Sequence, residues 1–295
     1  CLKPNMTKVG FIGLGIMGFP MSSHLSTKGF NTFVYNRTQE ISKKWADSNK
    51  GEVKTSPQDL AKSVDFLIMC VGNDDDVREI LFSKDGAYSS LKSGTIVIDH
   101  TTTSAKLAKE LSTKLKNKNC YYLDAPVSGG QLGAEEGNLT IMAGGEKEAY
   151  KKSLDVLAAY SKYSKYMGES GSGQLTKMVN QIAIAGLLQS LSEAVNFSEK
   201  SGLNSEDVFN VISKGAAQSW QMDNRWQTML KDEFDFGFTV DWMRKDLDIV
   251  SAEAKKIDAN IPITELVNNF YRQIQIDGHG ELDTSSLVKR LRKLP

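Results

Sequence analysis

Residues 8–18 read Lys-Val-Gly-Phe-Ile-Gly-Leu-Gly-Ile-Met-Gly, and this stretch decides the fold. An apolar run is followed by three spaced glycines, and an amphipathic stretch begins after them. This order predicts a strand, a tight turn and a helix. Gly13 permits the turn, Gly15 leaves the backbone open to a pyrophosphate, and Gly18 lets the helix pack closely on the strand. A glycine-rich turn that binds nothing is the alternative.

The helix after this turn would point free N–H groups and the positive end of its dipole at a phosphate. Dinucleotide binding is therefore predicted, with NAD(P)(H) as the cofactor. Contacts with the cofactor are expected from Gly13, Leu14, Gly15, Ile16, Met17, Gly18 and, at the end of a later apolar run, Val71.

The composition of the 295 residues indicates a globular protein with room for two domains. Its 36 basic and 36 acidic residues cancel, which argues against a nucleic-acid partner attracted by bulk charge. No apolar run reaches the roughly 18 residues of a membrane span, and no signal peptide is visible. The three cysteines, Cys1, Cys70 and Cys120, lack metal-site or disulfide spacing. We expect a cytoplasmic protein with no membrane contact and no metal.

The first half of the chain alternates apolar runs with stretches of helical spacing. The runs lie at residues 9–14, 32–35, 66–71, 95–98 and 121–123, with further strands expected at 139–143 and 165–167. The helical stretches lie at residues 41–46, 57–62, 77–82 and 105–115. The alternation predicts an α/β Rossmann-type domain over residues 1–168, with a parallel sheet covered on both faces.

The pattern changes at the glycine-rich segment 168–173. Residues 174–200 contain no proline and one glycine, and apolar residues recur at helical spacing on more than one face. Further helices are expected at 205–214, 220–229, 240–257 and 263–276, and from residue 284. We predict an all-α domain over residues 169–295, built on a long interdomain helix. Because such a helix is hard to bury within one chain, a homodimer or homotetramer is expected.

The second strand ends at Asn36, Arg37 and Thr38. In NAD-binding proteins an acidic residue usually stands here, about 20 residues after the glycines, and bonds the ribose 2′-OH. Neutral Asn36 followed by the fixed cation of Arg37 suits the 2′-phosphate of NADP better. We therefore predict that these three residues contact the cofactor and that NADP(H) is favoured. A polar turn with a solvated arginine is the alternative.

Polar residues also follow two later strands, and the carboxyl ends of parallel strands face the ligand crevice. The hydroxyls of residues 101–104 would reach the nicotinamide ribose or cap the next helix near Ser104. His100 is a candidate acid–base group, although a histidine beside a helix start is more often structural. The Ser-Gly-Gly turn at 128–130 offers a hydroxyl and open N–H groups to a carboxylate or carbonyl oxygen, or is an ordinary turn.

Lys177 and Asn180 lie three residues apart on one face of the long helix. A buried lysine is costly, so it either pairs or lowers its pKa. With a lowered pKa, Lys177 would protonate a carbonyl oxygen as hydride arrives and deprotonate the alcohol in the reverse direction. Asn180 would hold the same oxygen or a neighbouring carboxylate. A lysine that extends to solvent at a domain edge is the alternative.

Five motifs, in this order, resemble the β-hydroxyacid dehydrogenases, the family of 3-hydroxyisobutyrate dehydrogenase, tartronate semialdehyde reductase and glyoxylate/succinic semialdehyde reductase. They are GFIGLGIMG at 10–18, DAPVSGG at 124–130, GNLTIMAGG at 137–145, GSGQLTKMVN at 171–180 and KDL at 245–247. The resemblance runs from about residue 7 to 294. It implies a Rossmann domain joined to a helical domain that forms the interface of a dimer or tetramer. It also implies hydride transfer between NAD(P) and a short 3-hydroxy acid or its semialdehyde.

The resemblance implies residue roles as well. Lys177 matches the family's catalytic lysine, and Asn180 matches the asparagine on the same helix. The residues that match the substrate-carboxylate loop are Ser128, Gly129 and Gly130. Lys245 matches a lysine that reaches the cofactor, and Thr102 matches a hydroxyl residue on the nicotinamide side. Asp246 matches a partner without an assigned role, and Gln181 stands where some members have a second asparagine.

Other activities are open on this resemblance. The Asn36-Arg37 pair resembles the NADP-preferring branch, so an NADPH-dependent glyoxylate/succinic semialdehyde or tartronate semialdehyde reductase is the alternative. Imine reductases share the architecture but generally replace the catalytic lysine, so Lys177 argues against them. A non-enzymatic dinucleotide-binding module would lose that lysine and carry reader segments, and this chain has neither feature. Candidates for an apolar wall that selects the substrate, or else core residues, are Trp220, Met222, Phe236 and Phe238.

Overall fold

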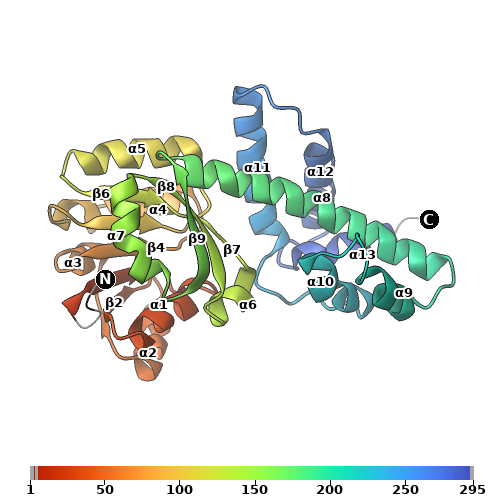
Figure 1. The fold of residues 1–295 in the computed structure, drawn as a ribbon, viewed down its shortest axis with the longest axis horizontal. Helices are drawn as coiled ribbons and strands as arrows, with labels where there is room; N and C mark the ends of the chain where they lie inside the picture. Colours follow the sequence, from red (N-terminus) through yellow and green to blue (C-terminus); the bar gives the residue numbers. More distant parts are fainter. Residues whose placement is uncertain (1–2, 4–5, 293–295) are drawn as a thin grey trace. The chain divides into compact units, whose positions relative to one another are not determined.

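The computed structural model of the protein describes residue 3 and residues 6–292. The chain divides into two compact units, which we call unit 1 (Cys1–Lys177) and unit 2 (Met178–Pro295). Figure 1 shows that unit 1 combines a sheet with helices and that unit 2 is helical. The expected fold class, a Rossmann-type α/β domain followed by an all-α domain, is thereby confirmed. Cys1 lies outside the described residues.

Unit 1 is organised around one sheet with the strand order β3-β2-β1-β4-β5-β6-β8-β7, and β9 pairs with β8. The strands are β1 (Lys8–Ile12), β2 (Asn31–Tyr35), β3 (Glu52–Val53), β4 (Phe66–Met69), β5 (Ile96–Asp99), β6 (Tyr121–Asp124), β7 (Val127–Ser128), β8 (Leu139–Gly145) and β9 (Ser161–Gly168). Every pairing from β3 to β6 is parallel, so the carboxyl ends of these strands share one edge. Strand β8 runs antiparallel to β6 and β7, a reversal that the sequence did not indicate.

Helices cover both faces of this sheet (Figure 1). They are α1 (Gly18–Thr27), α2 (Gln39–Ser48), α3 (Pro57–Ala61), α4 (Asp74–Phe82), α5 (Ala105–Lys116), α6 (Gly130–Glu135), α7 (Lys147–Leu157) and the 3-10 turn η2 (Ala87–Ser90). Successive residues of a strand point to opposite faces, so Phe11 packs in one apolar cluster and Ile12 in the other. A strand buried on both faces therefore reads as a continuous apolar run.

Helix α8 (Ser172–Lys200) begins in unit 1 and continues into unit 2. The remaining helices of unit 2 are α9 (Ser205–Ile212), α10 (Trp220–Leu230), α11 (Val240–Lys256), α12 (Pro262–Ile276), η3 (Thr284–Ser286) and α13 (Leu287–Arg292). Trp226 and Tyr271 are buried at the centre of this unit's core. Pro262 opens α12 at a position where its missing N–H costs nothing. Within residues 3 and 6–292, no helix combines the length and apolar character needed to cross a membrane.

Candidate functional site

The turn between β1 and α1 has the geometry expected of a phosphate cradle. Gly13 adopts φ 94°, which favours glycine, and its N–H donates to the Tyr35 carbonyl at 3.0 Å. A Cβ on Gly18 would lie 1.8 Å from the Gly13 oxygen, so a side chain there would force α1 away. A Cβ on Gly15 would meet no atom within 4 Å. The backbone at Gly15 is therefore open to an approaching ligand.

The start of α1 also suits an anion. Met17, the N-cap, makes no side-chain capping bond, and the first turn of this helix holds no acidic residue. Ile16 is 53% exposed, whereas Leu14 is buried in the core. Because the first N–H groups of a helix need acceptors, an uncapped start beside an open glycine fits a pyrophosphate.

The end of β2 is bonded directly to this turn. The Leu14 N–H donates to Asn36 Oδ1 at 2.9 Å, and Asn36 Nδ2 donates to the Thr38 carbonyl at 3.1 Å. Arg37 and Thr38 are exposed. The end of β2 thus carries a neutral amide bonded to the glycine turn, and the exposed Arg37 follows it in the chain.

The ends of β4 and β5 meet on the other side of the turn. The Val71 N–H donates to Thr101 Oγ1 at 3.0 Å, and a Cβ on Gly13 would lie 3.0 Å from Val71 Cγ1. Half-buried Thr102 is one residue from this contact. The Ser104 hydroxyl accepts from the Leu107 N–H and caps α5. The fold therefore brings Val71 to the glycine turn and places Thr102 nearby, while Ser104 serves the helix.

His100 is held inside unit 1. Its Nδ1 lies 2.6 Å from the Ala125 carbonyl oxygen and its Nε2 lies 2.9 Å from the Tyr160 hydroxyl. Burial lowers the pKa of His100 to about 4. With both ring nitrogens engaged and the side chain 2% exposed, these contacts favour the structural interpretation of His100.

Lys177 is buried beside the predicted substrate loop. Its side chain is 8% exposed, and Nζ donates to the Val127 carbonyl at 2.8 Å. Val127 and Ser128 form β7, and α6 begins at Gly130. Gly129 and Gly130 adopt φ 135° and 61°, so the backbone turns sharply after Ser128. Lys177 is therefore not a lysine that extends into solvent, and the fold places it next to residues 128–130.

Two predicted residues lie in unit 2 and belong to one network there. Asn180 Nδ2 donates to Gln181 Oε1 at 2.8 Å, and Gln181 Nε2 donates to Asp246 Oδ2 at 2.8 Å. Asp246 is 3% exposed, and its Oδ1 lies 3.1 Å from Lys245 Nζ. Gln181 and Asp246 thus connect Asn180 with Lys245, a connection that sequence reasoning did not find.

The four candidates for a selective wall have different surroundings in unit 2. Met222 is buried in the core, and Phe238 packs against that core. Trp220 is 46% exposed, and the Arg225 guanidinium lies 4.3 Å from the ring centre of Phe236. The core interpretation therefore applies to Met222, and the proposed wall stays a prediction.

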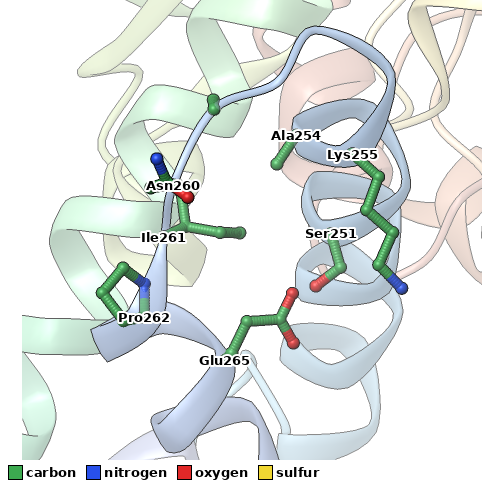
Figure 2. A pocket seen from close by; sticks show the side chains of 8 residues that line it. Ser251, Ala254, Lys255, Asn260, Ile261, Pro262 and Glu265 are labelled. Atoms are coloured by element: carbon green, nitrogen blue, oxygen red, sulfur yellow. The ribbon is translucent and has the colours of Figure 1, made fainter.

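A hollow of about 440 Å³ lies between the end of α11 and the start of α12 (Figure 2). It is lined by Ser251, Ala254, Lys255, Ala259, Asn260, Ile261, Pro262 and Glu265. The side chains of Ser251 and Glu265 point toward each other across it (Figure 2). No predicted site residue contributes to this lining.

Two buried carboxylates at the carboxyl-end edge of the sheet were missed from the sequence. Asp99 and Asp124 end the neighbouring strands β5 and β6 and stand opposite each other in register. Burial raises the pKa of each carboxyl to about 6. The Tyr122 hydroxyl donates to Asp99 Oδ2 at 3.0 Å. Asp124 opens the motif 124–130, which is the one sequence signal that pointed to it.

Comparison with known protein families covers nearly the whole chain. Residues 8–168 match a family model described as the NAD binding domain of 6-phosphogluconate dehydrogenase. Residues 171–291 match one described as NAD-binding of NADP-dependent 3-hydroxyisobutyrate dehydrogenase. Both parts of the chain are therefore covered by models of dinucleotide-dependent enzymes.

Individual proteins give the same result. An uncharacterized oxidoreductase from Shewanella frigidimarina is 47% identical over 288 residues, which are 98% of this chain and 99% of the relative. "Probable 3-hydroxyisobutyrate dehydrogenase-like 1, mitochondrial" from Arabidopsis thaliana is 38% identical, with 99% of this chain and 87% of the relative covered. The crystal structure of 3-hydroxyisobutyrate dehydrogenase from Salmonella typhimurium superimposes with a TM-score of 0.87 at 28% identity, covering 96% of this chain and 99% of that one.

Proposed function

The chain belongs to the β-hydroxyacid dehydrogenase family, and from this premise we propose that Lys177 is its general acid and base. Membership makes the chain an NAD(P)-dependent oxidoreductase that acts on hydroxy acids. The bound dinucleotide supplies or accepts the hydride. For the substrate we propose a short 3-hydroxy acid or its semialdehyde.

The burial of Lys177 beside β7 carries this proposal. Its Nζ is already held 2.8 Å from the Val127 carbonyl, next to the loop 128–130. A general acid and base must lie within hydrogen-bond reach of the proton that it transfers, and this position beside the loop meets that requirement. Lys177 would take the hydroxyl proton in oxidation and return it to the carbonyl oxygen in reduction. Its positive charge would also stabilise the developing oxyanion.

The substrate needs an orientation that points its hydroxyl at Lys177. The Ser128 hydroxyl and the N–H groups of Gly129 and Gly130 would hold the substrate carboxylate. In support, the backbone turns sharply here, and a Cβ on Gly130 would meet no atom within 4 Å. Asn180 would assist from the same helix that carries Lys177. Its amide is oriented by Gln181, which supports a fixed rather than a mobile contact.

The cofactor would lie along the edge formed by the ends of β1, β2, β4 and β5. Gly13, Gly15 and Gly18 would admit the pyrophosphate, with Leu14, Ile16 and Met17 lining the turn. Asn36, Arg37 and Thr38 would bind the 2′-phosphate, so we propose that NADP(H) is favoured. Contacts on the nicotinamide side would come from Val71, Thr102 and Lys245.

Replacement of Lys177 tests the proposal. Proton transfer contributes about 10²- to 10⁴-fold and a charge aimed at an oxyanion about 10²- to 10³-fold. Lys177→Ala should therefore lower kcat by at least roughly 10³-fold, with cofactor affinity nearly unchanged. Lys177→Arg should also fail, because a guanidinium stays protonated. Steady-state rates above a tenth of the unmodified value in Lys177→Ala would remove this residue from the mechanism.

A substrate panel separates the dehydrogenase from the reductase alternative. It consists of 3-hydroxyisobutyrate, 3-hydroxypropionate, glycerate, glyoxylate and succinic semialdehyde, each with both cofactors. The Asn36-Arg37 pair favours the reductase candidate, and turnover confined to glyoxylate or succinic semialdehyde with NADPH would establish it. Binding of NADPH without turnover of any member would point to the non-enzymatic module instead.

We further propose a homodimer or homotetramer, a domain division after residue 168 and a cytoplasmic location. The apolar residues exposed on unit 2 support the first point. Calorimetry that resolves two unfolding transitions would support two domains, and cell fractionation tests the location.

A further inference from the structure

The buried carboxylate of Asp124 binds the first turn of the helix that carries Lys177. Its Oδ1 accepts from the Gly171 N–H at 2.8 Å, and its Oδ2 accepts from the Gln174 N–H at 2.9 Å. Asp124 is fully buried at the end of β6. An anion that accepts the first N–H groups of a helix also meets the positive end of its dipole. Asp124 therefore fixes where α8 begins.

Two glycines let this contact form. A Cβ on Gly144 would lie 2.7 Å from Asp124 Oδ1, and a Cβ on Gly173 would lie 2.2 Å from the Asp124 carbonyl oxygen and 2.9 Å from Oδ2. Side chains at either position would push β8 or α8 away from the carboxylate. The two glycines thus let β8 and α8 approach both the carboxylate and the backbone of Asp124 closely.

Gln174 gives the same turn a second attachment. Its side chain is completely buried, its Oε1 accepts from the Thr103 N–H at 3.0 Å, and its Nε2 donates to the Thr101 carbonyl at 2.8 Å. Gln174 and Lys177 are three residues apart and therefore neighbours on one helix face. The start of α8 is held against the ends of both β5 and β6 before the chain reaches Lys177.

We propose that Asp124 is a positioning residue that acts through the first turn of α8 to hold Lys177 beside Val127 and the loop 128–130. This inference rests on the proposed role of Lys177. Asp124 also begins the segment that leads to Val127 and Ser128. The same residue therefore connects the first turn of α8, which leads to Lys177, with the loop beside Lys177. Gln174 is the second support of the same turn.

Asp124→Asn tests this role because it keeps the side-chain size but turns one acceptor into an NH₂ group that faces a backbone N–H. A misplacement of about 1 Å costs roughly 10²-fold in rate. We expect kcat per folded molecule to fall about 10²-fold, while the KM for NADP(H) is unchanged. The folded fraction is measured by circular dichroism. Gln174→Met, which removes both attachments of that side chain, should lower kcat in the same direction.

Tyr160→Phe is the matched control, since it removes a buried hydroxyl contact of unit 1 that does not involve α8. It should lower thermal stability and leave kcat per folded molecule unchanged. If Asp124→Asn does not fold, the kcat of Gln174→Met tests whether the first turn of α8 positions Lys177. An unchanged kcat per folded molecule in the variants that fold would overturn the positioning role. Lys177→Ala is measured beside these variants. If Lys177→Ala is inactive while Asp124→Asn and Gln174→Met are fully active, only the positioning role is wrong. If Lys177→Ala is active, the proposed catalytic role of Lys177 is wrong.

Discussion

We expect the choice between NADP and NAD to depend on Arg37. It is exposed at the end of β2, next to the amide that is bonded to the glycine turn. A hydrogen bond to a charged group contributes about 1.5–3 kcal/mol, so Arg37→Ala should raise the KM for NADP by roughly 10- to 100-fold. The KM for NAD should change little, because NAD lacks the 2′-phosphate. Steady-state kinetics with both cofactors provide the check, and equal use of the two by the unmodified protein would refute the preference.

His100 should make stability depend on pH. Its pKa is lowered from 6.5 to about 4 because burial disfavours the cation, so the folded protein binds fewer protons than the unfolded chain between these values. Stability should therefore fall by about 3 kcal/mol as the pH drops through this window. Asp99 and Asp124 act in the opposite sense, because their raised pKa values let the folded state hold protons as the pH falls below about 6.

The variant His100→Gln removes the contribution of the histidine to the pH dependence of stability and keeps the contributions of Asp99 and Asp124. Its melting temperature should fall less steeply between pH 6.5 and 4 than that of the unmodified protein. Thermal melts across this range give the comparison. Parallel curves for the two proteins would show that His100 titrates normally in the fold.

At the scale of elements, two glycines of the β1–α1 turn are expected to have different roles, one in cofactor binding and the other in stability. Gly15→Ala should leave the melting temperature unchanged, because its Cβ would meet no atom within 4 Å, yet weaken NADP(H) binding by filling the cradle. Gly18→Ala should destabilise the fold itself, because its Cβ would lie 1.8 Å from the Gly13 oxygen. Calorimetry and cofactor titration of both variants test this contrast. Equal losses of binding at equal stability would contradict it.

The elements that the sequence predicted are those with long periodic patterns. The apolar runs of β1 and β4 and the 29 residues of α8 stand out because burial imposes a period on many positions. Strands β3 and β7 have two residues each, too few for any period, and the short α6 is equally hidden. The direction of β8 depends on which strand it pairs with, not on its own residues.

The candidate site was predictable where a motif carries its own local geometry, as the glycine turn does. The buried supports were not, because their partners are distant in sequence. Asp124 bonds residues 47 and 50 positions later, and Gln181 reaches Asp246 across 65 positions. The spacing of apolar residues along the chain does not indicate contacts between residues so far apart in sequence.

At the scale of the whole molecule, several large apolar side chains of unit 2 are exposed to solvent. The side chains of Phe197 and Val211 are each 72% exposed, and that of Val179 is 66% exposed. We expect an assembly of at least two chains, since association would remove such side chains from water. Light scattering after size exclusion should give a multiple of 32.6 kDa. A mass of one chain at micromolar concentration would contradict this expectation.

The contact of Asp124 with Gly144 and Gly173 has an evolutionary consequence. A larger residue at Gly144 would meet the carboxylate, and a larger residue at Gly173 would meet the backbone carbonyl oxygens of positions 124 and 142. A smaller residue at position 124 would leave the start of α8 without its acceptor. Changes at residues in direct contact are non-additive. The three positions therefore constrain one another unequally: a change at position 124 would relieve part of the crowding at Gly144, whereas Gly173 stays restricted to glycine, because backbone oxygens are present whatever residue stands at 124.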